Sequence, residues 1–187
     1  SAYSTSSIES IGVAAGVSGT AAISGSNATN LLEDEITANW TGTNLSSTSS
    51  LTVSARQASN IDSLAGNVSG SLGAAVGAAV AVNRIGTVTR ANLLGEPIAR
   101  FYAGQGNWTL SGDDLVVSTE SDNEIDTIAV GMSAGAAGVQ GSVAVSVINA
   151  QTHTTVGADA TVSDLYFTDS VAITANSRDR IRALAGA

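Results

Sequence analysis

Residues 61–92, IDSLAGNVSGSLGAAVGAAVAVNRIGTVTRAN, carry the pattern that decides the fold. The stretch begins with the anchor Ile61-Asp62-Ser63-Leu64 and continues in a run of small residues that ends in Val80-Ala81-Val82-Asn83. A Thr/Ala-rich segment closes it at 88–92. Glycine recurs inside the run and costs roughly 1 kcal/mol per residue relative to alanine in a helix, whereas alternating side chains are typical of a strand. The stretch therefore predicts β-structure.

The same pattern occurs three times along the chain. The anchors begin at residues 8, 61 and 125, and a truncated fourth copy begins at 181, which gives spacings of 53, 64 and 56 residues. Each copy closes on an alternating strand, at 51–55, 115–119 and 171–175. Stacked copies bury a continuous core that one copy cannot bury alone. The sequence therefore predicts an all-β fold, a parallel β-solenoid (β-helix), as one elongated domain over 1–187 with repeats at about 8–60, 61–124, 125–180 and 181–187.

Three further expectations concern coils, loops and ends. A repeat near 55 residues is about twice an ordinary β-helix coil, so each copy is expected to supply two or more coils. The variable parts at 31–35, 93–106 and 163–168 are expected to be loops. No signal peptide is visible, which suggests a mature fragment or processed subunit. Because solenoids normally carry polar caps, we expect the chain to belong to a longer array or to polymerise end to end.

Composition excludes several classes of function. The chain is 43% apolar but only 4% aromatic, so its core must consist of Ala, Val, Ile and Leu. All seven basic residues are Arg and the net charge is −9, which excludes lysine-based chemistry and argues against nucleic acid and anionic membrane surfaces as partners. There is no Cys. Chains without Cys or Lys that are rich in Ser and Thr are typical of bacterial surface proteins.

The repeat resembles those of the giant secreted filamentous adhesins of Gram-negative bacteria, the leukotoxin-type and filamentous-haemagglutinin-like group. The shared pattern is the Ile-Asp-x-Ile anchor, a Gly/Ala run, Val-Ala-Val-Asn, Thr-x-Ala and a closing Val-x-Ala strand, best kept at 61–92 and 125–160. The first copy departs from it, with Ala22-Ile23-Ser24-Gly25 where Val-Ala-Val-Asn is expected. The resemblance implies a β-solenoid shaft of an extracellular, cell-surface protein used for attachment or biofilm cohesion, and it implies no catalytic residues.

Acidic residues are the main candidates for a binding site. The segment 113–126 is rich in carboxylates. Its calcium candidates are Asp113, Asp114, Asp122, Glu124 and Asp126, and Glu120 lies in the same segment. Calcium takes several carboxylate and carbonyl oxygens at once, but the segment lacks the spacing of an EF-hand loop. The favoured interpretation of the segment is a solvated acidic loop rather than a calcium site. A carboxylate pair that hydrolyses glycosides is the third interpretation. No cofactor is expected. His153 is the only histidine and is expected to lie exposed on a strand or turn.

The apolar runs and the two Trp residues leave alternatives open. Residues 63–82 and 128–148 are long enough to span a bilayer, but their Gly content favours buried strands of a tightly packed solenoid. Trp40 and Trp108 could stack on a sugar or pack over the ends of the core. We therefore expect a non-catalytic shaft or binding surface whose partners are neighbouring repeats, copies of itself, or a cell-surface glycan or matrix. The alternatives are a self-assembling fibre subunit joined by strand pairing and a carbohydrate-active β-helix enzyme.

Overall fold

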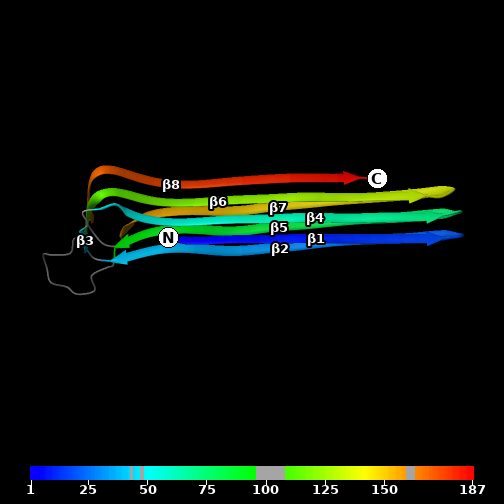
Figure 1. Ribbon diagram of the computed structural model, residues 1–187, viewed down its shortest axis with the longest axis horizontal. Helices are drawn as coiled ribbons and strands as arrows, with labels where there is room; N and C mark the ends of the chain where they lie inside the picture. Colours follow the sequence, from blue (N-terminus) through cyan, green and yellow to red (C-terminus); the bar gives the residue numbers. More distant parts are fainter. Residues whose placement is uncertain (43, 47–48, 96–107, 159–162) are drawn as a thin grey trace.

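The computed structural model describes residues 1–42, 44–46, 49–95, 108–158 and 163–187. These residues form strands and short turns, and every strand pairs in parallel with its neighbours (Figure 1). The prediction of an all-β, parallel fold is confirmed. The strands are β1 (Ala2–Ser18), β2 (Ala21–Gly42), β3 (Asn44–Ser46), β4 (Leu51–Ser71), β5 (Ala74–Gly95), β6 (Trp108–Ala134), β7 (Ala137–Ala158) and β8 (Ser163–Gly186).

The strands lie in two sheets that face each other. Sheet A has the order β1-β4-β6-β8, with the short β3 also pairing with β6, and sheet B has the order β2-β5-β7. The chain alternates between the sheets, so that β1, β4 and β6 each run into a two-residue turn and return as β2, β5 and β7. Each sheet-A strand packs against its sequence neighbours in sheet B. One coil of this solenoid is therefore one strand in each sheet.

The sequence repeat is one coil, so the expectation of two or more coils per copy is wrong. Ile8, Ile61, Ile125 and Ile181 are aligned in one row across β1, β4, β6 and β8. β4 has 21 residues and β5 has 22, whereas strands usually have about five or six. Two strands of this length use up a whole repeat.

The variable segment at 31–35 is strand and not loop. It lies within β2, where Leu32 points into the core while Glu33 and Glu35 are exposed. Residues 163–168 likewise belong to β8, and 93–95 to β5, while the rest of the predicted loop, 96–106, lies outside the described residues. Charged residues are tolerated here because every second position of these strands faces water.

The space between the sheets holds a thin core of small and aliphatic side chains. Ile61, Ile85 and Ile125 form one buried cluster with Leu32, and alanines form a second one nearer the turns. Val53 and Ala55 point into the third cluster, as the alternation at 51–55 predicts. The runs at 63–82 and 128–148 are only half buried, because alternate residues such as Val143 and Val145 lie on the outer face.

Polar side chains bridge the two sheets inside the same layer. Asn83, which is fully buried, donates a hydrogen bond from Nδ2 to Thr127 Oγ1 of sheet A (2.6 Å) and accepts one at Oδ1 from Asn30 Nδ2 of the neighbouring strand (2.7 Å). Thr127 Oγ1 lies 2.8 Å from Ser146 Oγ of the next sheet-B strand. Buried polar groups need such partners, since an unpaired one costs about 1–3 kcal/mol. These bonds fix the two sheets in register with each other.

Candidate interaction surfaces

Charged side chains are absent from the parts of the strands next to the turns. The segments on either side of the turns, 11–30, 65–83 and 127–147, contain no Asp, Glu, Lys or Arg. Outward side chains in these segments are largely apolar on both sheets, for example Ile11 (67% exposed) on sheet A and Ile23 (82%) on sheet B. We call this part the uncharged half. The remainder carries all of the charge and is the charged half.

On sheet A the charged half presents a ladder of opposite charges. Register places Asp122, Glu124 and Asp126 of β6 beside Arg178, Arg180 and Arg182 of β8. Glu124 Oε1 lies 3.3 Å from Arg180 Nη1, and Asp126 Oδ2 lies 3.1 Å from Arg182 Nη1. On the β4 side of β6, Arg56 Nε of β4 lies 3.6 Å from Glu120 Oε2 of β6. Exposed pairs of this kind contribute about 0–1 kcal/mol each, so the ladder sets register more than stability.

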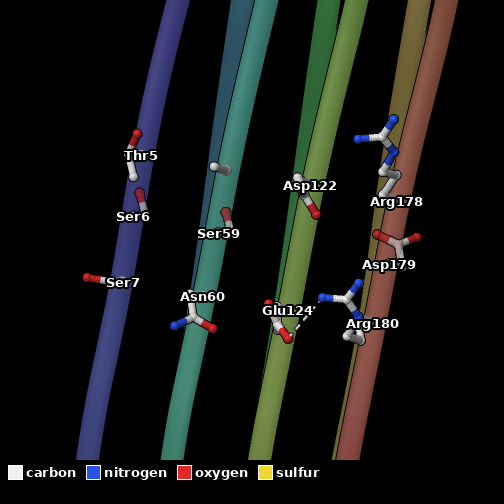
Figure 2. A pocket seen from close by; sticks show the side chains of 11 residues that line it. Thr5, Ser6, Ser7, Ser59, Asn60, Asp122, Glu124, Arg178, Asp179 and Arg180 are labelled. Atoms are coloured by element: carbon white, nitrogen blue, oxygen red, sulfur yellow. Dashed lines mark hydrogen bonds and ion pairs between the residues drawn. The ribbon is translucent and has the colours of Figure 1, made fainter.

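A furrow of about 580 Å³ crosses the strands of sheet A at this ladder (Figure 2). Its β1 and β4 side carries short side chains, among them Thr5, Ser7 and Ala58, while Glu124 and Arg180 stand on its β6 and β8 side. Hydroxyl, carboxylate and guanidinium groups at such an open surface suit hydrogen bonding to a sugar or a polar peptide.

The calcium candidates lie in two separate places. Asp122, Glu124 and Asp126 lie on alternate residues of one strand beside arginines, while Asp113 and Asp114 lie near the start of β6, where the register with β8 shifts between Gly112 and Asp114. Within the part of the chain that the structure describes, no group of three or more His, Asp or Glu side chains is placed to hold a metal ion. The arginines already supply the positive charge beside the β6 carboxylates.

Asp114 is held by two serines. Its carboxylate accepts hydrogen bonds from Ser170 Oγ (2.6 Å) and Ser50 Oγ (2.8 Å). These bonds, the one from Ser170 first, lower the pKa of Asp114 below its ordinary value. Asp113 accepts a bond from Thr168 Oγ1 (3.4 Å). Both aspartates therefore tie β6 to neighbouring segments at the ends of the strands.

The lowered pKa gives a measurable expectation. In a pH titration followed by NMR of side-chain carboxyl carbons, the pKa of Asp114 should lie below the ordinary value of an aspartate, and Ser170→Ala should raise the midpoint. Since the folded pKa is depressed, the stabilising contribution is present above the unfolded pKa and is lost as pH falls through the folded value. Ser118→Ala, on the same strand as Asp114, should leave the midpoint unchanged. An Asp114 midpoint that Ser170→Ala does not move would show that the hydroxyl is not responsible.

His153 lies where the sequence predicts, and Trp40 adopts one of the two positions that the sequence leaves open. His153 is exposed on β7, in register with Arg90 of β5. Trp40 points inward and packs against the cluster that contains Val53 and Ala55, so it packs over the core. The side chain of Trp108 lies outside what the structure describes. The described residues contain no helix long and apolar enough to cross a bilayer.

The inner face of β8 is covered on one side only. Sheet B places β7 against one side of β8 but has no described strand on the other side, and the inward side chains Val171, Ile173 and Ile181 are 55%, 51% and 47% exposed. The aligned residues of β6, Leu115, Val117 and Ile125, are fully buried. The edge of β7 next to this face has no strand partner among the described residues. Another strand added beside β7 would cover these side chains.

No family model matches the chain, and comparison with curated proteins and with solved structures gives no match.

Proposed function

We propose that this chain is a structural, non-catalytic shaft segment of an extracellular bacterial surface protein, with its side faces available for attachment or biofilm cohesion. The observation that carries the proposal is the in-register row of Ile8, Ile61, Ile125 and Ile181, because a stack of identical coils extends by simple addition. Outward Ser, Thr and Asn at the furrow, next to a ladder of opposite charges, support a polar binding surface. The resemblance of the repeat to filamentous adhesins supports the extracellular location.

A self-assembling fibre subunit is the second candidate, and the partly uncovered inner face of β8 favours it. Strand addition from a second copy beside β7 would bury Val171, Ile173 and Ile181. Simple end-to-end stacking of β1 on β8 does not achieve this, because among the described residues sheet A has one long strand more than sheet B and the position beside β7 stays empty.

Negative-stain electron microscopy over a concentration series distinguishes the two. A shaft segment should give short rods whose length does not change with concentration. Filaments that lengthen with concentration, and that Ile173→Asp abolishes while the outward control Ala172→Asp does not, would replace the shaft by the fibre subunit. Release of reducing ends from a polysaccharide panel, lost in Glu124→Gln, would instead make the furrow an enzyme site and overturn the structural role.

A further inference from the structure

The outer face of sheet B in the uncharged half forms a flat apolar surface. Its most exposed large apolar members are Ile23 (82%), Val139 (64%) and Leu31 (56%). The outward charges nearest to the turn are Arg84 on β5 and Glu33 on β2, and β7 carries no Asp, Glu, Lys or Arg along its whole length. We call the outward residues of 21–31, 74–84 and 137–147 the valine face, which is apolar except for Asn27 and Thr29 of β2 and for Arg84 at the border with the charged half. An apolar face of this extent marks an interaction site.

Small and larger side chains are sorted into separate rows across the valine face. Register across β2, β5 and β7 places only Ala and Gly in the first and third rows and larger side chains in the second, fourth, fifth and sixth rows. The rows in order from the turn are Ala21/Ala74/Ala137, Ile23/Val76/Val139, Gly25/Ala78/Gly141, Asn27/Val80/Val143, Thr29/Val82/Val145 and Leu31/Arg84/Val147. The third row has no side chain larger than a methyl group, so it forms a groove beside the larger fourth row.

We propose that a second copy of this chain packs on the valine face, with its strands antiparallel to those of the first. A two-fold axis along the stacking direction, between the third and fourth rows, places Val143 of each copy over Gly141 of the other and Val80 over Ala78. The same axis places the alanine row against the Leu31 row, and the second row against the fifth. Large side chains then meet small ones where the first row faces the sixth and the third row faces the fourth. The second and fifth rows, which are both β-branched, pack against each other. Each contact occurs twice, as an isologous interface requires.

The area and the charge both suit a second copy. At about 3.3 Å per residue and about 4.8 Å between strands, the face measures roughly 36 Å by 14 Å, or roughly 500 Å² per copy. Two copies bury roughly 1,000 Å² together, at the lower limit for a specific interface. Each chain carries a net charge of −9, and the antiparallel arrangement sends the two charged halves in opposite directions. A lipid surface fits less well, because hydrocarbon does not tolerate the edges of β2 and β7, which have no strand partner among the described residues.

The decisive variant is Gly141→Val. A Cβ at Gly141 meets no atom within 4 Å, so valine there leaves the fold intact but fills the groove that receives Val143 of the second copy. In sedimentation-velocity experiments over a concentration series, the variant should weaken dimerisation about tenfold or more. Gly157→Val is the matched control, because Gly157 also lies outward on β7, beyond the valine face, and also has open space around its Cβ.

Non-specific adhesion predicts the opposite result, since Gly141→Val makes the face more apolar. A wild-type chain that stays monomeric at all concentrations, or a dimer that Gly141→Val leaves unchanged or strengthens, would overturn the inference. A dimer lost in Ile173→Asp and kept in Gly141→Val would place the contact at the β8 end. Monomers that float with phosphatidylcholine vesicles would identify a lipid surface as the occupant.

Cross-linking tests the proposed register directly. The chain contains no cysteine, so introduced thiols have no competitor. Val76→Cys and Val82→Cys face each other across the proposed axis, whereas each residue lies about 20 Å along the strand direction from its own copy in the partner. A mixture of the two variants should form a disulfide-linked heterodimer on oxidation, and either variant alone should not. Equal cross-linking of each variant with itself would contradict the antiparallel register.

Discussion

Replacing Ile125 with alanine should lower the free energy of unfolding by about 3 kcal/mol. Ile125 is fully buried, and it packs with Leu32, Ile61 and Ile85 in the layer between the sheets. The loss has two parts, namely the transfer free energy of the deleted methyl groups and the cavity that remains. The cavity cannot collapse easily, because the anchor row holds the strands on both sides in register.

Urea denaturation followed by circular dichroism measures this loss, and Ile128→Ala is the matched control. Ile128 lies three residues further along the same strand but on the outer face, where it is 43% exposed. Its truncation should cost less than about 1 kcal/mol. Equal losses from the two substitutions would mean that the inner and outer faces of β6 are assigned incorrectly.

Replacing Gly73 with alanine should destabilise the stack by about 2–3 kcal/mol, through the turns. A Cβ on Gly73 would lie only 2.2 Å from the backbone oxygen of Thr20 in the preceding turn. That oxygen accepts a hydrogen bond from the backbone N–H of Ala74 (3.2 Å), and the oxygen of Gly73 accepts one from Ala137 (3.1 Å). Relieving the clash therefore separates turns that are bonded to each other.

Thermal denaturation of Gly73→Ala should show a lowered midpoint temperature, whereas Gly19→Ala should not lower the midpoint. Gly19 occupies the first turn of the stack, and a Cβ there meets no atom within 4 Å. Alanine at such a site reduces the freedom of the unfolded chain and is neutral or slightly stabilising. A loss of similar size at both glycines would indicate that backbone conformation, and not contact between turns, is what selects glycine.

The anchors show why the fold class follows from the sequence while the coil does not. The order of landmarks after Ile8, Ile61 and Ile125 reflects one structural unit per copy, which the aligned row confirms. The return from sheet A to sheet B is only two residues, Leu72-Gly73 in the second copy, inside a run already rich in glycine. The composition of those two residues does not differ from that of the strands on either side, so the sequence does not mark the turn and does not predict the length of one coil.

The sequence alone also does not indicate which face of each strand points into the core. The alternation in Val80-Ala81-Val82-Asn83 predicts two faces, and hydrophobicity alone would turn the valines inward. The structure buries Ala81 and Asn83, because the layer is thin and Asn83 finds hydrogen-bond partners in both sheets. The acidic cluster could be found from sequence, but its arginine partners could not, since Glu124 and Arg180 meet only when a spacing of 56 residues sets the register.

The in-register stacking also determines how this chain must fold. Every long strand pairs with residues at least 53 positions away in the sequence. The first pair of strands therefore forms only after a large loop closes, and chains with such distant contacts fold slowly. Loop-closure entropy grows only logarithmically, so the longer second spacing costs about 0.2 kcal/mol more than the first. Once two coils have met, each further coil docks on an edge that already exists. Folding of this chain should resemble crystal growth, with rare nucleation followed by rapid propagation along one dimension.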